Sequence, residues 1–465
     1  MAGPNDIALQ PPLSGNPGVS PAAEDRAYLG FIAAALAAAL SSGVLLAAWL
    51  PLAATGNAPG QDRVPWLIQA HGWIQVQGWA GLFVAGMALR LMPRFAGRPP
   101  IGRKVTIPLL IVLGVPVALR MTLQPWASGS AAELAAWTIG VSSALGAIGV
   151  AGILAFTLSL GRKPRDPWRY FAWAGAAWWG GLALMLWEWG RRAADHEGLA
   201  PIAWDDTMTW AVLLGPIGNF IWSVQSRSVP IFFGRKTPTW RQALVPGVAY
   251  NVGAALVALS LAREGETAAR MSGAGLALAG GGMAWLAVIA GSVWGQAKRL
   301  RPRARPAARF VLAANLSAVV AGVLLVWAGA EAALDAEYVR FAARDGARHI
   351  VGVGLVTMLI LGMARLVAPV FALERTESGV PRLYERMPFW LLLAALILRG
   401  GSALLAEEIS YEARMHVAAG AGTMAWVALA VFALSVARAI RNEGANKRAL
   451  EAQAHAAAER RARGQ

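Results

Sequence analysis

Three of the five histidines in this 465-residue chain stand at the start of long apolar segments, and the chain has no cysteine. They are His71, His349 and His416, and they begin the second, tenth and twelfth of twelve predicted membrane-spanning segments. Because even-numbered spans all run in one direction, we expect the three imidazoles at a similar depth on one side of the membrane. Neutral imidazole is a common ligand of haem iron, copper and zinc, so this arrangement predicts a metal or haem site.

The residues near these histidines favour a flat cofactor. Glycines follow each histidine closely, which leaves room either for a close helix contact or for a flat cofactor against the backbone. Trp79 lies on the same helical face as His71 and could stack on a macrocycle, although helix packing is the more frequent role of a tryptophan. Arg344 and Arg348 precede His349 and could pair with carboxylates such as haem propionates.

Two of the histidines meet the first requirement of bis-imidazole ligation, which is equal depth on facing helices. We therefore predict His71 and His349 as axial ligands of a b-type haem. His416 is predicted as a third ligand that replaces one of them or binds copper. For each histidine taken alone, an interfacial imidazole bonded to water or to a carbonyl is the alternative. The absence of cysteine excludes thiolate ligation and covalent c-type haem attachment.

The elements that must position these histidines are transmembrane helices. Hydrophobic residues make up 57% of the chain and charged residues 15%, with a mean hydropathy of +0.48, which is too apolar for a soluble globule of this length. Segments of about 20 apolar residues suffice to cross a bilayer. The sequence therefore predicts an all-α polytopic membrane protein with spans at 28–54, 66–92, 105–125, 131–160, 168–190, 206–233, 241–262, 271–297, 307–333, 347–373, 387–406 and 411–438.

The distribution of basic residues predicts the orientation. With twelve spans, 29 lysines and arginines fall on the side of the termini and nine on the other side. By the positive-inside rule, both termini are cytoplasmic. The net charge of +16 then reflects topology and attraction to anionic lipid, and no nucleic-acid partner is expected. Residues 1–27 are predicted to be a flexible tail, residues 28–440 the transmembrane domain, and residues 441–465 a basic tail that is either solvated or a surface helix.

A sequence motif recurs at the ends of the second and sixth spans. Residues 90–97 and 227–234 both read R-x-x-P-x-F-x-G, and residues 365–371 are a looser copy with Pro369 and Phe371. The arginines Arg90, Arg227 and Arg365 are separated by 137 and 138 residues. This spacing predicts three repeats of four helices around a pseudo-threefold axis. A topology anchor followed by a helix stop is the simplest role for each arginine.

These stretches resemble the NnrS family. The similarity is carried by residues 71–95, residues 219–234 and residues 348–365, and it extends over most of the chain. The resemblance implies a twelve-helix bacterial inner-membrane protein that binds haem and copper and is linked to nitric oxide and denitrification. The chain is also similar to the catalytic subunit of haem–copper oxidases, in which histidines of the second and tenth helices hold a low-spin haem. The sixth and seventh spans here lack histidine, so we do not predict oxygen reduction.

The function expected from these observations is haem-dependent nitric oxide response, protection or redox handling. Membrane lipid and a small ligand such as nitric oxide are the expected partners, and the sequence leaves the electron donor open. A secondary transporter without a cofactor is the alternative, with Gln75, Glu188, Asn219 and Arg227 along a polar path.

Overall fold

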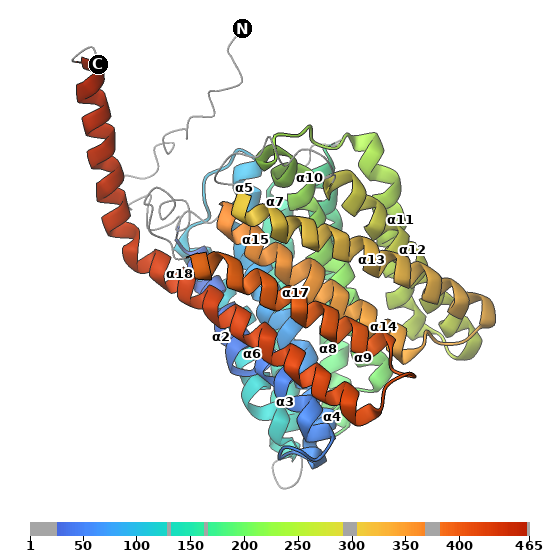
Figure 1. The fold of residues 1–465 in the computed structure, drawn as a ribbon. Helices are drawn as coiled ribbons and strands as arrows, with labels where there is room; N and C mark the ends of the chain where they lie inside the picture. The colour runs from blue at the N-terminus through green and yellow to red at the C-terminus, as the bar shows by residue number, and fades with distance from the viewer. Residues whose placement is uncertain (1–25, 128–131, 162–165, 292–304, 368–381, 463–465) are drawn as a thin grey trace.

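The computed structural model describes residues 26–127, 132–161, 166–291, 305–367 and 382–462. Within these residues the chain is helical and contains no strand (Figure 1). The α-helices and the π-helical segments η1, η3, η6 and η10 are, in chain order, α2 (Tyr28–Ala38), η1 (Ala39–Gly43), α3 (Val44–Ala54), α4 (Val64–Trp73), η3 (Ile74–Gly81), α5 (Leu82–Phe95), α6 (Arg103–Leu123), α7 (Ala132–Ser159), α8 (Pro167–Asp195), α9 (Ile202–Val212), η6 (Leu213–Ile217), α10 (Gly218–Phe232), α11 (Trp240–Leu259), α12 (Gly265–Gly291), α13 (Arg305–Asp335), α14 (Phe341–His349), η10 (Ile350–Thr357), α15 (Met358–Val367), α17 (Arg382–Leu404) and α18 (Tyr411–Ala462).

The helices have the composition of a multi-pass membrane protein. Ten helices within the described ranges are long and apolar enough to cross a bilayer. Two further predicted spans, 66–92 and 168–190, coincide with the continuous stretch α4, η3 and α5 and with α8. Both are helical, but they are not among the ten.

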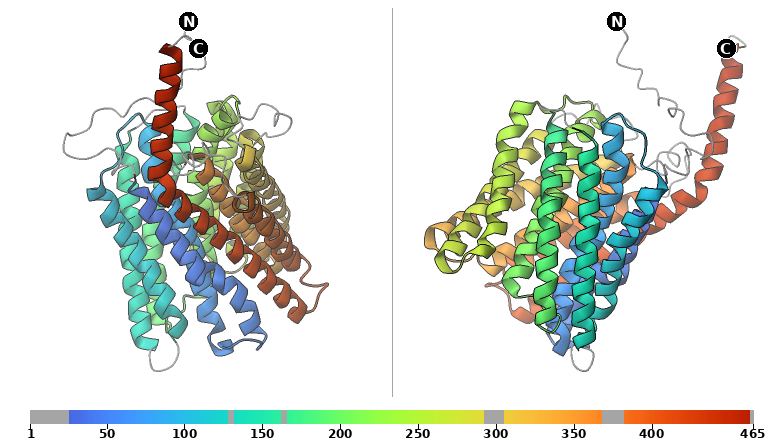
Figure 2. Two further views of the ribbon diagram at one scale, coloured as in Figure 1. Left: turned by 60° about the vertical axis from the view of Figure 1, so that its left-hand side comes forward. Right: turned by 180° about the vertical axis from the view of Figure 1, so that it is seen from behind.

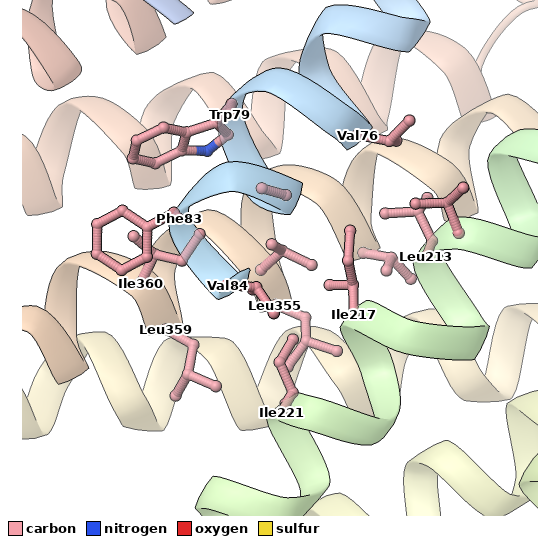
Figure 3. Packing of buried hydrophobic residues seen from close by; sticks show 14 of the residues in the cluster. Val76, Trp79, Phe83, Val84, Leu213, Ile217, Ile221, Leu355, Leu359 and Ile360 are labelled. Carbon is pink, nitrogen blue, oxygen red and sulfur yellow. The ribbon is translucent and has the colours of Figure 1, made fainter. Parts of the chain in front are cut away.

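Three helical stretches meet at the centre of the protein. The stretch from α9 to α10 and the stretch from α14 to α15 are the most buried of the ten, with 94% and 78% of their most apolar window buried. Figure 3 shows side chains of α5, α10 and α15 and of their π-helical segments packed together, with Phe83, Ile221 and Leu359 among them. The three stretches correspond to the second, sixth and tenth predicted spans.

Each of these three central stretches contains a π-helical segment. Segments η3, η6 and η10 all lie between two α-helical parts of the same stretch. Such wide turns are rare and frequently mark functional sites. Segment η3 begins three residues after His71, and η10 begins directly after His349.

The motif arginines make the same contact three times. Each guanidinium lies against an aromatic ring near the start of α2, α8 or α13, a cation–π arrangement that also shields the charge from the apolar layer. The distances from the guanidinium carbon to the ring centroid are 4.5 Å for Arg90 and Tyr28, 5.5 Å for Arg227 and Trp168, and 5.2 Å for Arg365 and Phe310.

The rest of the motif ends the helix. Gly97 and Gly234 adopt the left-handed conformation, with φ of 69° and 67°, in which glycine is not strained. The next backbone N–H donates to the proline carbonyl at 2.8 Å in the first copy and 2.7 Å in the second. This is the Schellman pattern of a helix C-terminus. In the third copy, Pro369 and Phe371 lie outside the described residues.

The last helix is longer than predicted. Helix α18 continues through residues 441–462, so this part of the basic tail is helical, which was one of the two alternatives. In Figures 1 and 2 its C-terminal part extends away from the other helices. Of the predicted flexible tail 1–27, residues 1–25 lie outside the described residues.

Candidate functional site

His71 and His349 line the same cavity, which has a volume of about 420 Å³. Its walls come from α3, α4 with η3, α9 with η6, α14 with η10, α17 and α18. Sites for small molecules and cofactors typically enclose roughly 300–1,000 Å³. The cavity therefore has the size expected of a cofactor site.

The ring of His71 is held by the backbone of η1. Its Nδ1 lies 2.8 Å from the carbonyl oxygen of Gly43. A carbonyl can only accept, so Nδ1 carries the proton and donates it to this bond. The lone pair is then on Nε2, which is the arrangement that second-shell partners impose on metal-ligating histidines.

His349 has the same tautomer for a similar reason. Its Nδ1 donates to the carbonyl of Asp345, one turn earlier, at 2.9 Å. A carboxylate oxygen of Asp345 lies 3.3 Å from the same nitrogen. A carboxylate behind an imidazole fixes its orientation and raises the basicity of the other nitrogen. Both imidazoles therefore carry their lone pair on Nε2, the form in which a histidine can bind a metal.

A network of ion pairs surrounds the histidine end of the cavity. Arg399 pairs with Asp345 at 2.7 Å, so one carboxylate contacts both a histidine and an arginine. Asp206 pairs with Arg344 at 3.0 Å and with Arg348. These pairs neutralise charges that would be costly within the membrane.

Only one of the two arginines predicted to contact a propionate lines the cavity. Arg348 does, whereas Arg344 is directed to Asp206 and is absent from the cavity wall. Arg399 and Arg414 also line the cavity. Three guanidinium groups thus border this end of the cavity, and two of them are ion-paired, Arg348 with Asp206 and Arg399 with Asp345.

Trp79 forms part of the wall, as its position relative to His71 predicted. Its indole Nε1 donates to the hydroxyl of Thr357 at 3.0 Å, which joins η3 to η10. The side chain is buried and packs near Phe83, with 5.7 Å between ring centroids. Trp79 therefore connects the two histidine-bearing helices and presents an aromatic surface to the cavity.

The structure does not bring His416 to the other two histidines. His416 is exposed, its Nδ1 donates to the Glu412 carbonyl at 2.9 Å, and it does not line the cavity. The adjacent Arg414 and Met415 line it instead, because successive residues of a helix point about 100° apart. In the described part of the chain, no group of three or more histidine, cysteine, aspartate or glutamate side chains could hold a metal ion.

The glycines near the histidines divide into two kinds. A Cβ added at Gly72 or at Gly352 would have no atom within 4 Å, and both glycines line the cavity. A Cβ at Gly86 would lie 2.5 Å from the Cβ of Phe31, so this glycine permits a close helix contact. Room for a cofactor and close helix packing, the two alternatives from the sequence, therefore apply at different positions.

The four residues of the transporter alternative do not share one cavity. Gln75 lines the histidine cavity, whereas Asn219 forms an amide pair with Asn251 at 2.8 Å. Glu188 accepts hydrogen bonds from Arg191 and Arg192 near the end of α8. Arg227, as described above, lies against aromatic rings.

The sequence analysis missed four charged residues of the cavity wall: Asp205, Asp345, Arg399 and Arg414. Arg399 carried a usable signal, because an arginine within an apolar segment of this length is rare and usually functional. Asp345 lies four residues before His349, which is one helical turn and therefore within reach of its ring.

No family model matches this chain, and no curated protein matches it. The resemblance to the NnrS family therefore stays a prediction.

Proposed function

We propose that this protein binds a haem between His71 and His349 and acts in the response to nitric oxide in the manner of the NnrS family. The observation that carries the proposal is the pair of imidazoles in one cavity, each with Nδ1 occupied and Nε2 available. A haem iron supplies one-electron chemistry and affinity for diatomic gases. Arg348, Arg399 and Arg414 are the partners for the propionates.

The link to nitric oxide and denitrification rests on the resemblance to the family. Nitric oxide is the expected small ligand, and redox handling or protection is the expected activity. Copper remains a second candidate cofactor from the same resemblance, and we assign no residue to it because His416 lies outside the cavity. We base the proposal on the two imidazoles alone.

We further propose twelve spans in three arcs of four, with both termini cytoplasmic in a bacterial inner membrane. Three of the four π-helical segments, η3, η6 and η10, and the three arginine–aromatic contacts lie at equivalent places in the chain and support the threefold repeat. The excess of basic residues on one side supports the orientation.

A visible absorption spectrum tests the haem. The purified protein should show a Soret band with the sharp low-spin α and β bands of bis-imidazole ligation, and metal analysis should give one iron per chain. His71→Ala and His349→Ala should each abolish the low-spin spectrum, and His416→Ala is the matched control because its ring is exposed. A colourless protein that elutes as a folded species, expressed with haem available, contradicts the proposal.

A further inference from the structure

The cavity is much longer than the part that the histidines border. Along α18 its lining runs from Tyr411 to Leu429, which is about 27 Å at the helical rise of 1.5 Å per residue. Along α4 and η3 it continues beyond His71 as far as Ala80, or about 13 Å further. We call the part bordered by Ala80, Val356, Ala395, Ala425 and Leu429 the inner arm.

The inner arm has almost no polar surface. On the two histidine-bearing helices, Gln75 and Thr357 are the only lining residues beyond the histidines with polar side chains, apart from the indole N–H of Trp79. The Thr357 hydroxyl donates to the Gly352 carbonyl at 2.9 Å and accepts from Trp79 at 3.0 Å, so its hydrogen bonds are made within the wall. The charged residues of the cavity belong to its other end, in α14, near the starts of α9 and α18 and near the end of α17.

Small side chains of α18 line the inner arm. The face of α18 that lines the cavity presents four small residues in succession, namely Ala418, Ala421, Gly422 and Ala425. Helix α3 lies directly against this face, because a Cβ at Gly422 would stand 2.4 Å from the backbone carbon of Ala47. A volume of about 420 Å³ spread over this length leaves a passage and not a wide chamber.

The apolar lining restricts which molecules can occupy such a passage. Water needs polar partners and does not fill an apolar cavity, and an empty void forfeits the packing contacts of its whole lining. We infer that the inner arm binds one linear aliphatic chain, isoprenoid or acyl. The chain's polar head then lies at the end with the histidines and arginines.

Three molecules carry such a chain together with a polar or charged head: a haem with an isoprenoid tail, a lipophilic quinol, and a membrane lipid. The inference goes beyond the proposed function, because a chain from a quinol or a lipid needs no haem. Measuring haem content in the same samples therefore separates failure of the chain site from failure of the haem site.

Photolabelling of the purified full-length protein tests the inference. The probe is a 16-carbon fatty acid with a terminal diazirine, and labelled peptides are identified by mass spectrometry. Adducts are expected on the peptides that contain Val356 and Leu429. Ala425→Phe should lower this labelling at least five-fold, and Thr423→Phe is the matched control because Thr423 is exposed on the same helix. Ala395→Phe repeats the test from the opposite wall if Ala425→Phe does not fold.

Labelling confined to exposed residues, or equal labelling of the inner-arm peptides in wild type and both cavity variants, overturns the inference. Organic extraction of the wild type identifies the natural source as a tailed haem, a quinone or a lipid. A tailed haem should lose Soret absorbance in Ala425→Phe together with the chain, whereas a quinone or lipid should be lost with the Soret band unchanged. An extract that is identical in wild type and Ala425→Phe also contradicts the inference.

Discussion

At the scale of single residues, the state of each histidine ring depends on what its Nδ1 contacts. His71 uses a backbone carbonyl alone, whereas His349 has a carboxylate as well. A carbonyl polarises an imidazole less than an anion does, so the ring of His349 is the more strongly polarised of the two. The asymmetry is a property of the sequence, since Asp345 is one turn from His349 and His71 has no acidic residue on the preceding turn.

This asymmetry predicts the effect of Asp345→Asn. The amide keeps the shape of the side chain but removes the negative charge shared by His349 and Arg399. Loss of a second-shell partner typically lowers metal affinity about 10–100-fold. We expect haem affinity, measured by Soret titration of the apoprotein, to fall within that range. Glu331→Gln removes a carboxylate that pairs with an exposed arginine, and it should leave the titration unchanged.

The open glycines predict a steric test of the cavity. Leucine at Gly352 would extend into space that has no atom within 4 Å of its Cβ, so the helix tolerates it while the cavity loses volume. Gly352→Leu should reduce bound haem per protein at least ten-fold without lowering thermal stability, since leucine favours helix by about 1 kcal/mol over glycine. Gly420→Leu is equally unobstructed but lies outside the cavity, and it should retain full haem. Equal haem content in the two variants would show that the cavity is not the haem site.

For two of the predicted site residues, depth in the membrane is the property that the sequence specifies. His71 and His349 start parallel apolar segments, and the structure puts both on one cavity. His416 satisfies the same depth rule but faces away from the cavity. The predicted span 411–438 is largely apolar all round, so its pattern does not indicate which face is buried. The ion pair of Arg344 was not predictable for a related reason, since its partner Asp206 is 138 residues away in the chain.

At the scale of elements, the π-helical segments were not predictable from local sequence. Glycine-rich runs also occur in α12, which is α-helical throughout, so composition alone does not produce a wide turn. Segments η3, η6 and η10 occur where three buried stretches meet (Figure 3), whereas η1 lies in the less buried first span, between α2 and α3. The helix stop after each motif arginine was predictable, because proline and glycine have strong local preferences.

Close contact between α5 and α2 predicts the outcome of a conservative change at Gly86. A Cβ there would lie 2.5 Å from the Cβ of Phe31, below any real separation. Gly86→Ala should therefore destabilise the protein by about 1–3 kcal/mol through overpacking, despite the better helix propensity of alanine. Thermal unfolding in detergent measures this loss of stability. The control Gly114→Ala adds a Cβ with nothing within 4 Å and should be neutral or stabilising.

At the scale of the whole molecule, the question is how many helices cross the membrane. The stretch of α4, η3 and α5 carries His71, yet it is not among the ten helices with the composition of a span. Its polar content has a structural reason: most of its residues are buried among other helices, so they contact protein and not lipid. A helix that faces lipid must be apolar, whereas a helix surrounded by protein can contain more polar residues.

If the stretch of α4, η3 and α5 crosses the membrane, the residues before α4 and after α5 lie on opposite sides of it. Because the chain contains no cysteine, single substitutions report their own exposure without background. Asn57→Cys and Pro99→Cys are both at exposed positions on either side of the stretch. In intact cells a membrane-impermeant maleimide should label Asn57→Cys, whereas Pro99→Cys should react only after lysis, as the excess of basic residues around position 99 requires. Labelling of both variants from the same side would leave α4, η3 and α5 as a re-entrant stretch. His71 and His349 would then enter the cavity from helices that differ in topology, and the threefold repeat would lose its first member.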